Sequence, residues 1–315
     1  CFEAHQGKYP VIWMTFKDIK ERDWNTCYDK LTGMIRNIFR DYRDILLSSE
    51  ICDETDRKLV RRLLEKTASP GECEDSMRFL SESLSGHYQE KVVILIDEYD
   101  TPLHAGYSEG YYEDVIRFLR NFLSGGLKDN EHLFRGVLTG ILRVARESVF
   151  SGLNNPGVYT LLDEEFDTSF GFTEDEVAEL LRDYGMADRY EEVSHWYNGY
   201  LFGSQVIYNP WSVISYIASK SRKARPWWVN TADTGMIDRL ATRGGREIRE
   251  ELGRLLEGGT VTKPVYESIV MRDLETQDDI LWSFLVFSGY LKLSEQADEE
   301  NFVLEIPNKE VRIIY

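Results

Sequence analysis

Hydrophobic residues in this chain of 315 residues occur both in short continuous runs and at helical spacing. Val92–Ile96 is apolar throughout, which indicates a strand buried on both faces, as at the centre of a parallel sheet. Tyr9–Phe16 and Leu133–Thr139 predict two further strands, and the second of these also has the pattern of a buried strand. A helix between the strands at 92 and 133 would complete a βαβ unit with a right-handed crossover. The pattern therefore predicts an α/β fold.

Apolar residues three and four positions apart predict the helices that connect and follow these strands. In the first half, helices are expected near 24–42, Asp53–Lys66, Glu72–Tyr88, Tyr111–Leu123 (after a loop from Pro102, and ended by Gly125-Gly126) and Ile141–Phe150. From Thr173 the chain changes to helices and aromatic-rich loops, so we expect an α/β core at 1–170 and a mainly helical extension at 171–315. Further expected elements are a strand at Val158–Leu162, helices near Trp211–Ser219, Thr234–Leu240, Arg246–Leu256 and Leu281–Leu293, and a terminal hairpin that includes Phe302–Ile306.

Composition narrows the classes of function that the chain can have. A formal net charge of −18 argues against a surface that neutralises nucleic-acid phosphates. The longest apolar run is far shorter than the roughly 18 residues of a membrane helix. The four cysteines are widely spaced without a Cys-x-x-Cys motif, which favours reduced structural thiols in a cytoplasmic protein.

Two adjacent carboxylates, Asp97 and Glu98, directly follow the central strand, at the edge where open α/β sheets bind ligands. An apolar strand followed by Asp-Glu is the Walker B pattern of P-loop ATPases, in which Asp holds Mg²⁺ and Glu polarises the attacking water. Thr139 ends the next strand, and Arg143 follows closely enough to neutralise charge on a phosphate. The residues alone leave two alternatives open, namely acids that solvate a strand end and an ordinary surface arginine.

Several stretches of the chain resemble the bacterial AAA-ATPase-like family, whose members are often fused to a C-terminal PD-(D/E)XK nuclease-like domain. They span nearly the whole chain in order: YPVIWMTFKD, VVILIDEYDTPLH, FRGVLTGILRVARESVFSGLNN, FGFTEDEV, HWYNGYLFG, VIYNPWSV, LWSFLVFSGYLKL and EIPNKEVR. The resemblance implies a P-loop NTPase-like parallel sheet that uses Mg²⁺ and ATP. It also implies that Asp97 binds the metal and that Glu98, Thr139 and Arg143 serve catalysis.

Asn209-Pro210 is similar to the Gly-x-Pro motif that signalling ATPases of this superfamily place beside the adenine. The alternative is a proline in the first turn of a helix. The nearby aromatics Trp196, Tyr197, Tyr200 and Tyr208 could stack on a base, although aromatics at this density more often form the core of a small domain.

The chain departs from the family at the Walker A loop. Phosphate binding in P-loop enzymes needs Gly-x-x-x-x-Gly-Lys-[Ser/Thr], which does not occur in the 315 residues. We expect that this loop was removed with the N-terminus rather than lost. The chain is therefore expected to act as an Mg-ATP-dependent switch or hydrolase in the intact protein. The alternative is a non-hydrolysing scaffold that positions a C-terminal nuclease-like domain or a protein partner.

Overall fold

The computed structural model describes residues 2–48, 51–141, 156–228, 245–267, 278–298, 300–313 and 315. The chain divides into two compact units. The first comprises Cys1–Pro156 with Ser268–Thr276, and the second comprises Gly157–Glu267 with Gln277–Tyr315. The domain boundary expected between residues 170 and 171 falls inside the second unit.

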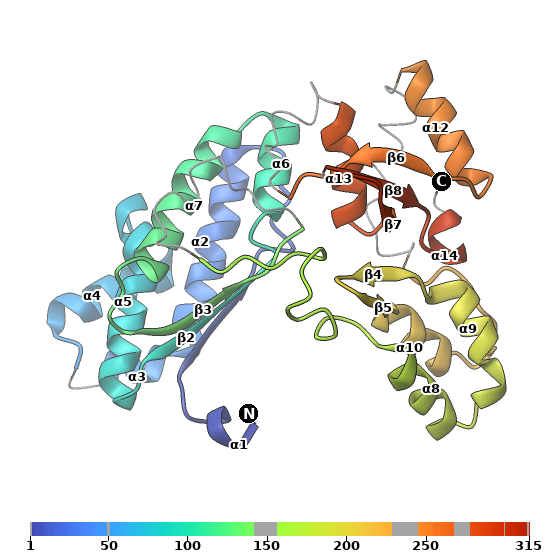
Figure 1. Cartoon of the computed structure of the whole chain (residues 1–315). Coiled ribbons are helices and arrows are strands. Elements are labelled where there is room, and N and C mark those ends of the chain that lie inside the picture. The colour runs from blue at the N-terminus through green and yellow to red at the C-terminus, as the bar shows by residue number, and fades with distance from the viewer. Residues whose placement is uncertain are drawn as a thin grey trace. The chain divides into compact units, whose positions relative to one another are not determined.

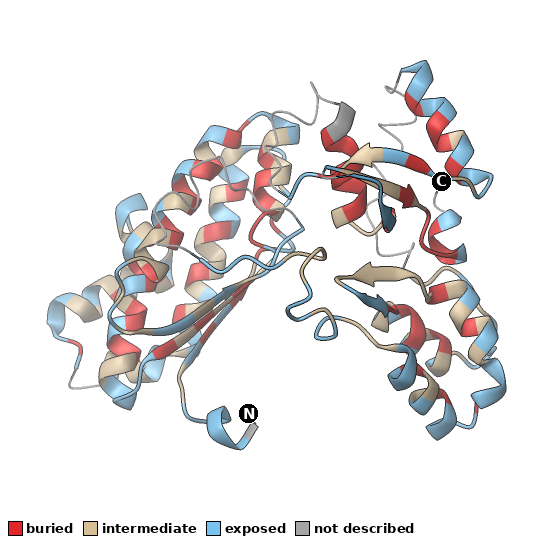
Figure 2. Cartoon of the chain, viewed as in Figure 1, coloured by how far each residue is buried: buried red, intermediate tan, exposed pale blue. Residues whose placement is uncertain are grey.

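The first unit contains a parallel sheet, which confirms the α/β prediction. Its strands lie in the order β1 (Val11–Thr15), β2 (Val92–Asp97) and β3 (Leu133–Leu138). Helices α2, α5 and α7 lie along one face of this sheet, and each contributes buried residues (Figures 1 and 2). The helices described in this unit are α1 (Phe2–His5), α2 (Trp24–Asp41), α3 (Arg43–Ser48), α4 (Glu54–Glu65), α5 (Pro70–Tyr88), α6 (Thr101–Glu109) and α7 (Tyr112–Leu127).

Local capping explains where several of these helices begin. Asp23 accepts a hydrogen bond from the Thr26 amide at the start of α2. Asp53 and Ser69 each form a reciprocal capping box at α4 and α5. The prediction that α5 begins at Glu72 was two residues late, because Pro70 is favoured in the first turn, where no backbone N–H is needed.

Two predictions around α6 and α7 were wrong. The segment after Pro102 is not a loop, because Pro102 occupies the first turn of helix α6. Gly125-Gly126 does not end α7, which continues to Leu127. Both glycines lie where α7 crosses α5: a Cβ at Gly125 would lie 3.1 Å from the Glu74 carbonyl oxygen, and one at Gly126 would lie 3.0 Å from Met77 Cβ. These glycines therefore permit close helix packing.

The two faces of the sheet differ in exposure. Ile12, Met14 and Ile94 point toward the helices and are almost fully buried. On the opposite face, Val11, Trp13 and Val137 are 41%, 58% and 44% exposed. The prediction that β3 is a buried strand was therefore wrong. In the described sheet β3 is an edge strand, so its apolar composition is not matched by a second neighbouring strand.

The second unit contains two small antiparallel sheets and short helices (Figure 1). The sheet orders are β4-β5 and β6-β8-β7. Among its described residues the elements are α8 (Glu174–Asp183), η1 (Ala187–Arg189), α9 (Tyr190–Tyr197), β4 (Tyr200–Phe202), β5 (Gln205–Ile207), α10 (Pro210–Ala218), α12 (Arg246–Leu256), β6 (Val261–Pro264), α13 (Asp278–Phe287), β7 (Lys292–Gln296), β8 (Asn301–Glu305) and α14 (Lys309–Arg312).

The sequence predicted α10 and α12 and one strand of the terminal hairpin well, but two elements differ. Val158–Leu162 forms no strand. The expected helix Leu281–Leu293 stops at Phe287, because Gly289 adopts a left-handed φ of 80° and the chain then enters β7. The helix expected at Thr234–Leu240 lies outside the described residues, as does all but the first residue of the one expected at Ile141–Phe150.

A buried carboxylate, Glu310 in α14, joins separate parts of the second unit. Its Oε2 accepts a hydrogen bond of 2.7 Å from Ser212 Oγ, at the start of α10. Its Oε1 accepts hydrogen bonds from the backbone amides of Trp227 (2.6 Å) and Trp228 (2.8 Å). Burial raises the pKa of this carboxyl group, although these three donors act in the opposite direction.

Candidate functional site

The carboxylate of Asp97 is fixed by hydroxyl groups from both neighbouring strands. Thr15, at the end of β1, donates a hydrogen bond of 2.9 Å to Asp97 Oδ2. Thr139, directly after β3, donates one of 2.9 Å to Asp97 Oδ1. All three residues stand at the carboxyl ends of parallel strands, so the sheet brings them together. The carboxylate is thus held in one orientation at the edge of the sheet.

Thr139 also connects Asp97 to Glu98. The Glu98 amide lies 3.4 Å from the Thr139 hydroxyl oxygen and donates to it. The Tyr99 amide donates to the Thr139 carbonyl oxygen over 3.1 Å. The structure therefore brings Asp97, Glu98 and Thr139 into one cluster. In this conformation the Thr139 hydroxyl proton is directed at Asp97, so the visible effect of Thr139 is to orient the Asp97 carboxylate and to hold the Glu98 backbone.

Glu98 is exposed and has an unusual backbone conformation. Its φ of 48° lies in the left-handed region, which a residue other than glycine rarely adopts. Thr101, in the first turn of α6, donates a hydrogen bond of 3.2 Å to Glu98 Oε2. The carboxylate is therefore restrained while remaining accessible to solvent, as a group that polarises water must be.

A third carboxylate next to this cluster in the sequence, that of Asp100, is only 1% exposed. Its Oδ2 accepts a hydrogen bond of 2.9 Å from the Ile141 amide and lies 3.2 Å from His104 Nε2. Sequence reasoning did not select Thr15, Asp100 or His104. Thr15 could have been found by the rule that selected Thr139, a polar residue at the end of a parallel strand. The burial of Asp100 has no signal in a single sequence.

The donor atoms of this cluster are suited to Mg²⁺. Asp97, Thr15 and Thr139 offer carboxylate and hydroxyl oxygens, the ligand type that this hard cation prefers. Within the described part of the chain, no three His, Cys, Asp or Glu side chains form a metal-binding group. Magnesium sites commonly need one or two carboxylates because waters and phosphates supply the remaining ligands. The cluster therefore fits a nucleotide-bound magnesium ion better than a protein-only metal site.

The remaining predicted site residues are Arg143, Asn209 and Pro210. Arg143 is outside the described residues. Asn209 and Pro210 belong to the second unit, where Asn209 Oδ1 caps α10 by accepting hydrogen bonds from Trp211 N and Ser212 N, and Pro210 occupies the first turn. Both residues line a hollow of about 260 Å³ with aromatic walls that include Tyr200 and Trp228. Tyr197 and Tyr208 are fully buried core residues.

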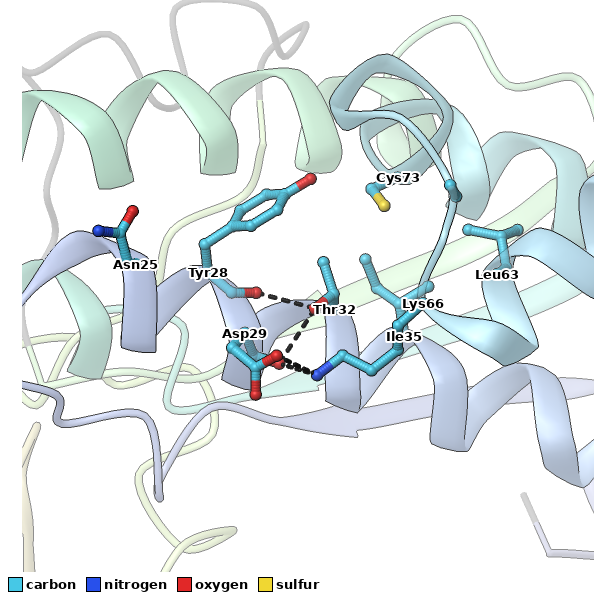
Figure 3. A pocket seen from close by; sticks show the side chains of 9 residues that line it. Asn25, Tyr28, Asp29, Thr32, Ile35, Leu63, Lys66 and Cys73 are labelled. Atoms are coloured by element: carbon cyan, nitrogen blue, oxygen red, sulfur yellow. Dashed lines mark hydrogen bonds and ion pairs between the residues drawn. The ribbon is translucent and has the colours of Figure 1, made fainter.

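Another hollow, of about 310 Å³, lies among α2, α4 and α5 (Figure 3). The Lys66 ammonium group forms an ion pair with the Asp29 carboxylate and donates 2.9 Å to the Asp29 carbonyl oxygen. Burial raises the pKa of the Cys73 thiol at the far wall, which disfavours the reactive thiolate. Because Lys66 is already paired and the thiol is not activated, no catalytic chemistry is assigned to this hollow. Its lining residues are Asn25, Tyr28, Asp29, Thr32, Ile35, Leu63, Lys66, Ala68 and Cys73.

Three comparisons bear on what this chain is related to. Residues 2–150 match the AAA-ATPase-like family, described as predicted AAA-ATPases. A relative from Azotobacter chroococcum mcd 1, named as an uncharacterized protein in the vnfD 5′ region, is 28% identical over 228 residues. That similarity covers 71% of this chain and 42% of the relative, so the chain spans less than half of the relative's length. No solved structure matches. Among the described residues, no helix combines the length and apolar character needed to cross a membrane.

Proposed function

Because residues 2–150 match the AAA-ATPase-like family, we propose that this chain is the Mg-ATP-binding part of a nucleotide-dependent switch or hydrolase. The observation that carries the proposal is the clamped Asp97 carboxylate beside the exposed Glu98, at the carboxyl end of the central strand. Family membership suggests the use of a nucleotide and Mg²⁺. We also propose that the parallel sheet has the P-loop NTPase architecture.

In the proposed reaction, each acid has a separate role. Magnesium, when bound with the nucleotide, would neutralise charge on the transferred phosphoryl group. Asp97, oriented by Thr15 and Thr139, would hold the metal. Glu98 would accept a hydrogen bond from the attacking water and polarise it. Arg143 is proposed to neutralise phosphate charge, and Thr139 to respond to the γ-phosphate by shifting its hydroxyl from Asp97.

A phosphate-binding loop is the part that the 315 residues do not supply, because they lack the Walker A motif. In the described part of the sheet β3 is an edge strand, and this edge and the exposed face around Trp13 and Val137 support the proposal that a further strand and helix complete the sheet. Parallel sheets in α/β proteins are normally covered on both faces. Turnover is therefore expected from the full-length protein.

Asn209 and Pro210 are proposed to contact the adenine. The aromatic lining of their hollow supports the proposal. A nuclease-like domain that follows this chain in the full-length protein is a proposed partner. The net charge of −18 supports the proposal that these residues do not themselves bind nucleic acid.

Hydrolysis of Mg-ATP by the full-length protein tests the proposal. Glu98→Gln should lower kcat by roughly 100-fold or more, because general-base assistance contributes about 10²–10⁴. Binding of Mg-ATP, measured by calorimetry, should persist in this variant. Glu109→Gln, the same chemical change at the exposed end of α6, is the matched control and should retain full turnover.

These measurements distinguish a nucleotide-dependent switch or hydrolase from a non-hydrolysing scaffold. Equal turnover in the wild type and Glu98→Gln would remove Glu98 from the mechanism. Mg-ATP binding without turnover by the wild type would favour a nucleotide-dependent switch that does not hydrolyse. The absence of both binding and turnover would favour the scaffold alternative.

A further inference from the structure

Hydrogen bonds join the loop after β2 to the loop after β3, and each loop supplies donors as well as acceptors. Thr139 accepts from the Glu98 amide through its hydroxyl and from the Tyr99 amide through its carbonyl oxygen. In the opposite direction, the Ile141 amide donates to Asp100 Oδ2 over 2.9 Å. The conformation of the segment Thr139–Ile141 therefore depends on a side chain from the first loop.

The Asp100 carboxylate can accept the hydrogen bond from the Ile141 amide only because Gly140 has no side chain. A Cβ at Gly140 would lie 2.8 Å from Asp100 Oδ1 and 2.7 Å from Tyr99 Cε1. Both distances are shorter than nonbonded contacts allow, so the Asp100 carboxylate and Gly140 are fitted to each other. A larger residue at position 140 would displace either the carboxylate or the loop.

A carboxylate that is 1% exposed is costly unless donors or a charge compensate it. His104, four residues later on α6, places Nε2 3.2 Å from Asp100 Oδ2. It shares that oxygen with the Ile141 amide. An imidazole N–H at this position stabilises Asp100 as an acceptor and so favours the hydrogen bond to Ile141.

We propose that Asp100 and His104 are a positioning pair for the site. They hold Gly140 and Ile141 against the end of β2, and this keeps the preceding Thr139 hydroxyl on Asp97 Oδ1 and beside the Glu98 amide. Neither residue needs to touch the nucleotide. The effect on turnover rests on the proposed function, whereas the effect on the loop does not.

The test measures amide hydrogen exchange of a peptide that covers Thr139–Ile141, together with kcat and KM for Mg-ATP, in the full-length protein. His104→Leu removes the donor and should accelerate exchange by about 10–100-fold, the equivalent of one hydrogen bond to a charged group. It should lower kcat more than it raises KM. His104→Gln retains an N–H donor and should restore both measurements to within about threefold.

His87→Leu is the matched control, since it makes the same change in the last turn of α5. Gly140→Ala displaces the carboxylate without altering His104, so it replaces His104→Leu if that variant fails to fold, and it should give the same faster exchange. Equal exchange in His104→Leu and His87→Leu would overturn the proposal. So would fast exchange that His104→Gln does not correct.

If the wild type shows no turnover, the proposed function fails. The exchange measurement still tests whether Asp100 and His104 position the segment Thr139–Ile141.

Discussion

At the scale of single residues, Glu310 shows how the second unit depends on one buried acceptor. Ser212 and the amides of Trp227 and Trp228 all donate to its carboxylate. Glu310→Ala would remove this acceptor from all three donors. Because each unsatisfied buried group costs about 1–3 kcal/mol, the variant should lose roughly 3 kcal/mol or more of unfolding free energy.

Glu310→Gln is the control for this loss. Its amide oxygen can accept from both tryptophan amides, and its NH₂ group can donate to Ser212 Oγ after the hydroxyl rotates. We expect its unfolding free energy in urea to stay within about 1 kcal/mol of the wild type. Equal destabilisation by Ala and Gln would mean that the hydrogen bonds are not the cause.

The stability difference between wild type and Glu310→Gln should depend on pH. The pKa of Glu310 is raised in the folded state above its usual 4.5, so the folded protein binds this proton more tightly than the unfolded chain. The stabilising contribution is therefore complete below pH 4.5 and is lost as pH rises through the folded-state pKa. Urea unfolding of both proteins from pH 4.5 to pH 8 should show the wild type losing stability relative to Gln.

At the scale of secondary-structure elements, the crossing of α5 and α7 depends on small residues. Gly126→Ala should destabilise the protein by about 1–3 kcal/mol, because the added methyl group would overlap Met77. Gly33→Ala in α2 is the matched control. Its nearest neighbour would be Lys66 Nζ at 3.9 Å, so it should instead stabilise by about 0.5–1 kcal/mol through helix propensity. Thermal unfolding of both variants checks the contrast.

Periodicity in the sequence was sufficient to predict strands β1 and β2, helices α2, α4 and α10, and the meeting of Asp97, Glu98 and Thr139 at one edge of the sheet. Periodicity failed where the same residue type occurs in two different structural settings. Gly125-Gly126 is typical of a helix end, yet here the pair permits contact between helices. Similarly, the apolar residues of β3 indicated burial, although neighbouring strands, rather than composition, decide which strand lies at an edge.

At the scale of the whole molecule, the chain consists of two units with separate cores. The first packs helices on a parallel sheet, and the second contains two further clusters, one around Trp282 and one around Tyr197. We expect scanning calorimetry to resolve more than one transition, because each unit buries its own apolar surface. A single transition with equal calorimetric and van't Hoff enthalpies would contradict this expectation.

The left-handed backbone of Glu98 implies a trade-off between stability and function. A side chain in this conformation costs on the order of 1 kcal/mol, which a glycine would largely avoid. Glu98→Gly should therefore melt at a temperature equal to or above that of the wild type while losing the exposed carboxylate. Selection for stability alone would remove the glutamate from this position. A glutamate at this strained position is what the proposed role of the Glu98 carboxylate requires.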